Sequence, residues 1–486
     1  MYLLKRLEVI SLINLIKNEI YKILHKKSLY IVLLITTLFV LLTQLIYNSD
    51  LTVSVYIEDN YESEEYFVKV MENEGETDSE EYLDSKIYVE TYKYADSFGK
   101  DSWQKYIINN HEIYNGKVYS IIERIVKYEL GKNKNKIEYE EALKEKEELT
   151  KELKNLDWKT FLKNDIERIK INIKNSESAE KYYLEAELEV LYLREKYNIE
   201  YKYDEFNEYL DNYKSNRATL ISYEIVDEDN LKPEQKNIIK EAKKEVELAK
   251  YKIENHIEKI EYGSNHYILS NFYTEYFTMI IIIIILISGS IVSEEFSKGT
   301  IKLLLVKPYT RTKILISKYI TVLLTILFAV VFTLIMQLII GGIFFGYDTL
   351  SIPHITYNLT TNTIEAIHIF KYLLLLTITT LPKLIIIGTI SFMISTIFTS
   401  TSLANTLTLI FVFGSDVLNV IAEGFEIEWL KFSPTLNWDF SVYLFGGTSP
   451  YKGVTLPFSI INCLVYFILM IVVTIIIFKR KNIKNI

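Results

Sequence analysis

Residues 272–319 read, in four successive blocks, FYTEYFTMIIIIIILISGSIV, SEEFSKGT, IKLLLVKPYTRTK and ILISKY. The first block, residues 272–292, is an apolar run long enough to cross a bilayer as a helix. Residues 293–300 are short and charged, residues 301–313 are basic, and a second long apolar run begins at Ile314. This order predicts a membrane helix, an amphipathic connector on the water side, and a second membrane helix.

Charge is divided unevenly along the 486 residues. Residues 51–270 carry 50 acidic and 34 basic side chains, a net charge of −16, whereas the remainder carries 13 and 20, a net charge of +7. An acidic block inside a basic, apolar frame is typical of a membrane protein with one large soluble insert. Because an acidic insert repels phosphate, nucleic-acid binding is not expected. The single cysteine, Cys463, allows no internal disulfide and no cysteine-based metal site.

Apolar runs of spanning length recur along the chain. We expect six membrane helices, at residues 29–47, 272–292, 314–344, 371–398, 403–421 and 457–478. Residues 1–28 place apolar side chains at helical spacing opposite lysines, which predicts an amphipathic helix in the membrane interface rather than a cleaved signal peptide. The fold class expected is therefore an α-helical polytopic membrane protein.

The basic residues indicate the orientation. They gather before the first span, in the connector of residues 293–313 and in the C-terminal tail, whereas the loops at 345–370 and 422–456 are acidic. Positive charge stays on the cytoplasmic side. We therefore expect a multi-pass protein of the cell membrane with both termini and the connector in the cytoplasm. Residues 48–270 would then be extracellular, and residues 271–486 would hold the second to sixth spans.

The insert shows two textures. Alternating runs at residues 51–57 and 86–92 predict a small mixed region that includes strands. The later part has no glycine between Gly131 and Gly263, only one proline, and many Glu, Lys and Leu residues, which favours long helices. We expect a mainly helical domain in which an antiparallel coiled-coil stalk is built from helices at 138–198 and 232–262, joined by 201–230.

Several segments together resemble the ABC-2-type transporter permeases. They are Glu294-Glu-Phe-Ser-Lys-Gly-Thr300 with the following Leu303 to Lys318, the N-terminal Ile16 to Lys22, and the closing Phe478 to Ile483. Each motif is short, but they occur in the family's order and at matching positions relative to the spans. The resemblance covers the spans and the connector, and it leaves out the insert, which is far larger than is usual for these permeases.

The resemblance implies that residues 293–313 form a coupling segment that docks on a cytoplasmic ATP-hydrolysing subunit. Its expected residues are Glu294, Glu295, Gly299, Thr300, Leu304, Pro308 and Arg311. On physical grounds, the glycine would turn the chain, the proline would end a short helix, and the arginine would anchor the next span at the headgroups. A purely topogenic role, with basic residues for orientation and Gly and Pro for turning, explains part of the same pattern.

No Walker A pattern occurs in the chain, so we expect no enzyme activity and no cofactor in this subunit. The resemblance implies that ATP and Mg²⁺ bind to two partner ATPase subunits, and that a second permease copy or homologue completes the membrane part. Lys383 and Asp416 are ionisable residues within expected spans, which makes them functional candidates. They could also form a structural ion pair. No metal site is expected.

The function expected from the resemblance is the membrane-spanning part of an ATP-driven exporter. Its substrate would be amphipathic, lipidic or a peptide, and the large insert suggests antimicrobial-peptide export or immunity. The alternative is a membrane scaffold or sensor that transports nothing and whose extracellular stalk binds an unknown partner or ligand. An ATPase that copurifies with the chain would distinguish the first function from the second.

Overall fold

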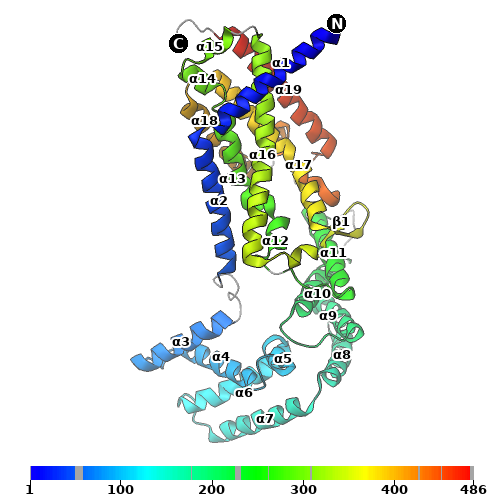
Figure 1. Cartoon of the computed structure of the whole chain (residues 1–486). Coiled ribbons are helices and arrows are strands. Elements are labelled where there is room, and N and C mark those ends of the chain that lie inside the picture. The colour runs from blue at the N-terminus through cyan, green and yellow to red at the C-terminus, as the bar shows by residue number, and fades with distance from the viewer. Residues whose placement is uncertain are drawn as a thin grey trace. The chain divides into compact units, whose positions relative to one another are not determined.

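A computed structural model of the chain describes residues 2–49, 58–176, 178–224, 231, 233–260, 262–306, 309–424, 427–449, 451 and 453–481. The described residues are mostly helical (Figure 1). They fall into two compact units. We call residues 1–49 with 260–486 the apolar unit, and residues 50–259 the insert unit.

The apolar unit contains every helix that is long and apolar enough to cross a membrane, and there are six of these in the part of the chain that the structure describes. Its helices are α1 (Tyr2–Leu24), α2 (Lys27–Asn48), α12 (Asn265–Ser270), α13 (Phe272–Ser288), α14 (Ser293–Ser297), α15 (Ile301–Leu305), α16 (Arg311–Phe345), α17 (Ile369–Ile397), α18 (Thr401–Gly424) and α19 (Leu456–Arg480). The six predicted spans are all helical, with ends that shift by a few residues.

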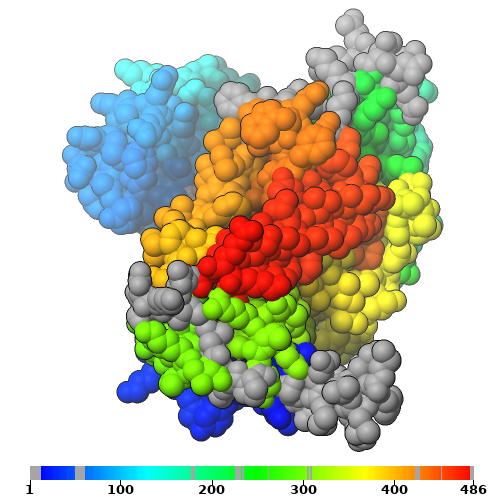
Figure 2. Space-filling model, turned by 90° about the horizontal axis from the view of Figure 1, so that it is seen from above, coloured from blue at the N-terminus to red at the C-terminus, as the bar shows by residue number. Residues whose placement is uncertain are grey.

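Helix α13 forms the centre of this unit. It packs against α2, α16, α17 and α18. Of the 18 residues in its most apolar stretch, 67% are buried. Helices α18 and α19 each bury only 22% of theirs. Figure 2 shows α19, in red, on the surface. Its outward side carries exposed Ile461, Leu464 and Ile468, an apolar surface of the kind that faces lipid.

Short elements close the two ends of the apolar unit. Figure 1 places α14 and α15 beside α1 at one end, and α12 and β1 at the other. The strands β1 (His354–Asn358) and β2 (Thr363–Ile367) form an antiparallel hairpin in which His354 pairs with Ile367. The remaining short elements are the 3-10 helices η3 (Asp348–Ser351), η4 (Glu428–Phe432), η5 (Pro434–Leu436) and η6 (Phe440–Gly446).

Every regular element that the structure describes in the insert unit is a helix. Its helices are α3 (Glu58–Glu74), α4 (Glu80–Asp96), α5 (Trp103–Asn110), α6 (Glu112–Glu129), α7 (Lys136–Asn155), α8 (Trp158–Asn175), α9 (Ser178–Tyr197), α10 (Glu205–Glu224) and α11 (Pro233–Glu254). The predicted strand at 86–92 is wrong, because these residues lie inside α4, where Ile87 and Val89 are buried. The other predicted strand, at 51–57, lies outside the described residues.

The predicted stalk is also wrong in its helix boundaries. The stretch 138–198 is three helices, interrupted at Leu156–Asp157 and at Ser176. Asp157 starts α8 because its side chain accepts hydrogen bonds from the backbone N–H groups of Lys159 and Thr160, at 3.0 and 3.1 Å. Helices next to each other in sequence then pack together, α8 with α9, α9 with α10, and α10 with α11. The insert is a series of helical hairpins rather than one long coiled coil.

Candidate functional site

The connector after α13 begins at a closely packed turn. At Gly289 there is no room for a Cβ atom, because Asn405 and Ser391 press against it. Two backbone N–H groups at the start of α14, those of Val292 and Ser293, donate to Oγ of Ser395 on α17, at 3.2 and 3.0 Å. This hydroxyl satisfies donors that a helix N-terminus leaves unpaired. The start of α14 is therefore fixed to α17.

Glu295 of α14 belongs to a group of four charges, with Glu19, Lys22 and Lys318, in which each carboxylate pairs with both lysines; we call it the buried ion cluster, although the Lys22 side chain is 39% exposed. The Lys318 side chain is 0% exposed and its ammonium has three acceptors, Glu19 Oε2 at 2.7 Å, Glu295 Oε1 at 2.8 Å and the carbonyl of Ile291 at 3.0 Å. An ammonium has three donors, so each finds a partner. Such pairing is what makes a buried charge tolerable.

Lys22 completes the buried ion cluster from α1. Its Nζ atom lies 3.0 Å from Glu19 Oε1 and 2.7 Å from Glu295 Oε1. Burial lowers the pKa of Lys22, but the negative charges of Glu295 and Glu19 outweigh it, and the pKa lies above its usual value. The cluster holds two cations and two carboxylates. It joins α1 to α14 and α16, which lie more than 260 residues further along the chain.

A second, more exposed set of ion pairs surrounds the cluster. Glu294 pairs with Lys26, just after α1, and with Lys298 at 2.6 Å. Lys26 also donates to Ser290 Oγ at 3.2 Å. A groove of about 600 Å³ runs along these residues between α1 and the connector, and Thr300 and Leu303 line it too. Both glutamates of the predicted coupling segment therefore bind lysines at the N-terminal end of the chain.

The rest of the predicted coupling segment divides into a turn and an anchor. Gly299 has a φ of +68°, which separates α14 from α15, and Thr300 Oγ1 donates to the carbonyl of Glu295 at 3.5 Å. Arg311, at the start of α16, donates from Nη1 to the carbonyls of Lys479 at 2.9 Å and Lys481 at 3.3 Å. It therefore caps the end of α19, in addition to any contact with headgroups.

Two predicted residues cannot be placed fully. Leu304 belongs to α15, but its side chain lies outside the described part of the structure, and so does Pro308 altogether. Their neighbours Leu303 and Val306 are 73% and 86% exposed. The connector thus presents apolar side chains outward while its glutamates point to the cluster.

Phe296 and Lys481 tie α14 to two further membrane helices. Phe296 is buried and its ring meets that of Phe478 on α19, with centroids 6.4 Å apart. The Lys481 ammonium lies 4.1 Å from the Phe296 ring centroid and donates to the carbonyl of Thr396 at the end of α17, at 2.7 Å. Burial lowers the pKa of Lys481. Cation–π contact of this kind contributes about 0.5–2 kcal/mol.

The two ionisable residues predicted within spans do not meet. Lys383 on α17 lies 3.5 Å from Asp439 and over the ring of Phe277, at 4.3 Å from its centroid. Asp416 is exposed on α18. The pairing of Lys383 with Asp416 that the sequence allowed is therefore wrong, and the lysine takes its carboxylate from the loop between α18 and α19.

Of the buried ion cluster, the sequence predicted only Glu295 as a site residue, and it predicted none of the contacts. A signal was present for two of the others, Glu19 and Lys318, because each occupies a position in a buried helical stripe. Glu19 lies four residues from both Leu15 and Ile23, which are 6% and 8% exposed. Lys318 lies four residues from Ile314 and Val322, which are 1% and 0% exposed. Opposite charges in two buried stripes predict a pair.

These features define a class, the mostly helical membrane proteins, and one of the relatives found, YdbK, is described as a membrane protein. Residues 243–484 match a family described as a protein of unknown function, DUF2705. An uncharacterized protein of Bacillus subtilis, YhcI, is 33% identical over 204 residues, which are 41% of this chain and 64% of YhcI. An uncharacterized membrane protein of the same organism, YdbK, is 29% identical over 189 residues, 39% of this chain and 72% of YdbK. No solved structure matches.

Proposed function

We propose that this chain is a membrane-spanning subunit of an ATP-driven transporter of the ABC-2 type. In this proposal α14 and α15 receive the movement of a separate ATPase subunit on the cytoplasmic side. Two such ATPases and a second permease copy or homologue would complete the assembly. The proposed substrate is amphipathic, lipidic or a peptide, and export of an antimicrobial peptide, or immunity to one, is the specific form we propose.

The buried ion cluster is the observation that carries this proposal. A connector that only turns the chain between two spans needs basic residues and a glycine, but no buried ion pairs. Here Glu295 is bound to Lys22 of α1 and to Lys318 of α16. Separating these charges would leave some of them unpaired away from water, which is strongly unfavourable. A push on α14 would therefore move α1 and α16 with it.

The outer surface of the connector suits a protein partner. Leu303 and Val306 are the exposed apolar residues, and the exposed Lys298 stands near them in sequence. Apolar residues at the centre of a patch with charges at its rim are the usual composition of a protein interface. We propose that this patch is the surface that meets the ATPase.

Copurification tests the proposal. The full chain, tagged and extracted from its native membrane in mild detergent, is expected to bring down an ATP-binding subunit that mass spectrometry identifies. The double variant Leu303→Glu with Val306→Glu is expected to lose that subunit, because it places charge at the centre of the patch. Tyr66→Glu, at an equally exposed position of the insert unit, is the matched control. Wild-type protein that never captures an ATPase would reject the proposal.

Cysteine labelling tests the proposed topology. Cys463 is buried, so Cys463→Ala gives a background in which single cysteines can be introduced. In intact cells a membrane-impermeant maleimide should label Lys144→Cys in the insert unit, and should label Leu303→Cys only after the cells are opened. Labelling of both positions in intact cells would place the connector beyond the reach of a cytoplasmic ATPase.

A second function is favoured by one observation in the insert unit. This unit contains a cavity in which the described residues form no ion pair with Arg194 or Asp211, a feature that a spacer between membrane helices does not need. A scaffold or sensor in which the insert binds a ligand, with the membrane helices relaying the signal, is therefore the alternative. The copurification experiment separates the two, because only the transporter requires the ATPase.

A further inference from the structure

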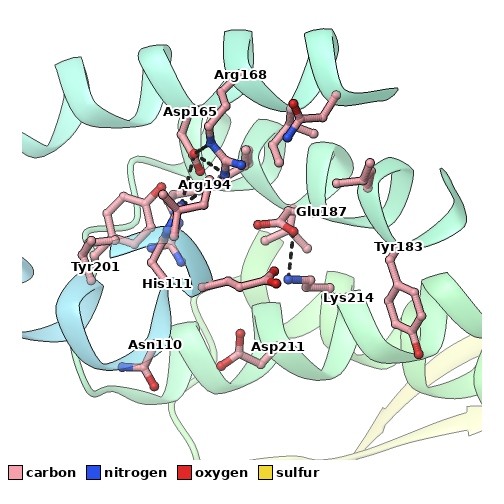
Figure 3. Close-up of a pocket in the computed structure, with 18 of the residues that line it drawn as sticks. Asn110, His111, Asp165, Arg168, Tyr183, Glu187, Arg194, Tyr201, Asp211 and Lys214 are labelled. Carbon is pink, nitrogen blue, oxygen red and sulfur yellow. Dashed lines mark hydrogen bonds and ion pairs between the residues drawn. The ribbon is translucent and has the colours of Figure 1, made fainter. Parts of the chain in front are cut away.

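The insert unit has a cavity of about 630 Å³, which we call the insert cavity. Its wall comes from α5, the start of α6, α8, α9, the loop after α9, and α10. Figure 3 shows Asp165 and Arg168 along one side, Asp211 on the opposite side, and Tyr201 and Tyr183 at two ends. A volume of this size is in the range of small-molecule sites.

Two groups of charges in the insert cavity are already satisfied by one another. Asp165 Oδ1 lies 3.2 Å from His111 Nε2 and accepts from Arg168 Nε at 2.8 Å. The hydrogen bond from His111 and the charge of Arg168 outweigh burial, so the pKa of Asp165 lies below its usual value. On another part of the wall, Lys214 pairs with Glu187 at 3.1 Å.

Arg194 is held in place without a carboxylate. It is 4% exposed, and its guanidinium carbon lies 3.8 Å from the centroid of the Tyr201 ring. Its Nη1 donates to the carbonyl of Ile199 at 3.3 Å, which the chain can reach because Asn198 turns it with a φ of 53°. In the described part of the structure, Arg194 Nε has no hydrogen-bond partner.

Asp211 is the charge of opposite sign. Figure 3 shows it pointing into the insert cavity from α10. Among the described residues no ion pair joins Asp211 to a cation, although Arg194 and Lys214 are near enough to lower its pKa. Asp211 is itself exposed to solvent, and partial desolvation raises its pKa. Arg194 and Asp211 therefore face one cavity with opposite charges and no contact between them.

Further polar atoms without partners lie in the same wall. Among the described residues these are the Tyr201 hydroxyl, Asp165 Oδ2 and His111 Nδ1, and all three belong to side chains that are less than one tenth exposed. Buried polar atoms normally have a partner, and a cluster of exceptions in one cavity calls for a bound group. The set offers donors and acceptors together, and the aromatic and aliphatic residues between them, such as Tyr106 and Leu184, supply an apolar surface.

We propose that the insert cavity binds a small zwitterion, either a free amino acid or a short peptide. The ligand's carboxylate would bind Arg194 and its ammonium would bind Asp211, while its side chain would rest against the tyrosines. A ligand with one charge would engage only one of these two groups. This inference does not depend on the transport proposal, because it concerns the insert unit alone.

Three probes that differ by one charged group test the proposal. The full chain in detergent is titrated with phenylalanine, with phenylethylamine and with 3-phenylpropanoate, while calorimetry and hydrogen–deuterium exchange record binding. Phenylalanine should bind at least tenfold more tightly than either singly charged analogue and should protect α9 and α10 from exchange. The other free amino acids and trialanine are tested in the same way, since the pocket's preferred side chain is what the panel determines. If none of them binds, the proposal is rejected.

Variants identify the groups responsible. Asp211→Asn should weaken the zwitterion at least tenfold while 3-phenylpropanoate binds as before, because only the ammonium loses its partner. Arg194→Lys keeps the positive charge but loses the paired N–H donors of the guanidinium, and Arg194→Met removes the charge and the donors together. Glu205→Gln, on the same helix but outside the insert cavity, should bind like the wild type. Equal binding by Asp211→Asn and the wild type would overturn the assignment. Equal affinity for all three probes would show an apolar pocket instead.

Discussion

The buried ion cluster of the apolar unit and the insert cavity treat charge in opposite ways. In the cluster, Lys318 has an acceptor for each of its three donors, and both carboxylates are shared between two lysines. In the insert cavity, Arg194 and Asp211 stand without an ion pair among the described residues. Charges that satisfy one another fix elements in place. Charges that have no such partner within the protein are available to bind a ligand.

The comparison separates two tasks within one chain. Every charge of the cluster has an oppositely charged partner, although Glu295 Oε2 has no hydrogen-bond partner among the described residues. Its value is mechanical, since it joins α14 to α1 and α16. In the insert cavity Arg194 and Asp211 fasten nothing to each other, because no ion pair joins them in the described part of the structure. The membrane part and the insert can therefore be tested independently, by removing charges from each and asking which change destabilises the protein.

The largest effect is expected at Lys318. Lys318→Met leaves Glu19 and Glu295 buried with Lys22 as their remaining cation, and breaking a buried pair of this kind destabilises a protein by about 3–5 kcal/mol. Thermal unfolding of the full chain in detergent measures the change. In this variant, hydrogen–deuterium exchange should rise first in α1 and α14.

Two variants control for this result. In Lys318→Met with Glu295→Gln, one charge of each sign is removed, so much of the lost stability should return. Lys383→Met removes a lysine from another membrane helix, where the ion pair with Asp439 is 3.5 Å long and partly exposed, so a loss below about 1 kcal/mol is expected. Equal losses of unfolding free energy for Lys318→Met and Lys383→Met would mean that the cluster contributes no more to stability than an ordinary ion pair.

The second largest effect is expected at Asp165, where the stability of the insert unit should depend on pH. The pKa of Asp165 lies below its usual value, so this carboxylate stabilises the insert unit above about pH 4, the ordinary value for aspartate. That stability is lost as the pH falls through the lowered pKa. Asp165→Asn should remove about 1.5–3 kcal/mol at pH 7, the contribution of hydrogen bonds to a charged group.

The pH dependence distinguishes this role from simple packing. With wild-type protein, exchange in α6 and α8 should rise steeply on acidification below pH 4. With Asp165→Asn the same segments should be less protected at pH 7 and change less with acid. A variant profile parallel to that of the wild type would show that Asp165 makes no charge-dependent contribution.

The third effect is expected in the turn between α14 and α15. Gly299 has a φ of +68° and no heavy atom near the position of a Cβ, so Gly299→Ala brings only backbone strain, about 1–2 kcal/mol. Gly414 also has open space around it but lies inside α18, so Gly414→Ala should be stabilising by about 0.5–1 kcal/mol. Thermal unfolding of both variants checks the opposite signs. If Gly299→Ala is stable but loses the ATPase, the turn matters for docking rather than for folding.

The sequence predicted much of the apolar unit because lipid imposes a simple rule. Spans need apolar runs of fixed length, and those runs can be read directly, as with α13 and α16. The insert obeys no such rule. Its charged, glycine-free stretch predicted helices correctly, but nothing in the pattern of leucines predicted that Asp157 would end one helix and start the next. Side-chain capping is a local event, and it broke the expected stalk into hairpins.

The candidate site was predicted in part for a related reason. Glu294, Glu295 and Arg311 were named from a motif, yet Glu295 pairs with Lys22, 273 residues away, and Arg311 with the carbonyl of Lys479, 168 residues away. Pairing over such a separation depends on how helices pack. The insert cavity was missed entirely, because Arg194 and Asp211 look like ordinary solvated charges in a sequence where such residues are common.

The smallest effect is expected at Arg194, and it is the sharpest test of the comparison. Arg194→Met removes a buried cation that makes no ion pair with the carboxylates the structure describes, and an apolar side chain of similar length can still rest on Tyr201. Replacing a buried charge by an apolar group of similar volume is often neutral or stabilising, so the change in unfolding free energy should stay within about 1 kcal/mol. Zwitterion binding should be lost at the same time. A variant that folds as well as the wild type and no longer binds would show that Arg194 is kept for a ligand. A loss as large as that of Lys318→Met would mean instead that the guanidinium holds the insert together, and the contrast between the two regions would disappear.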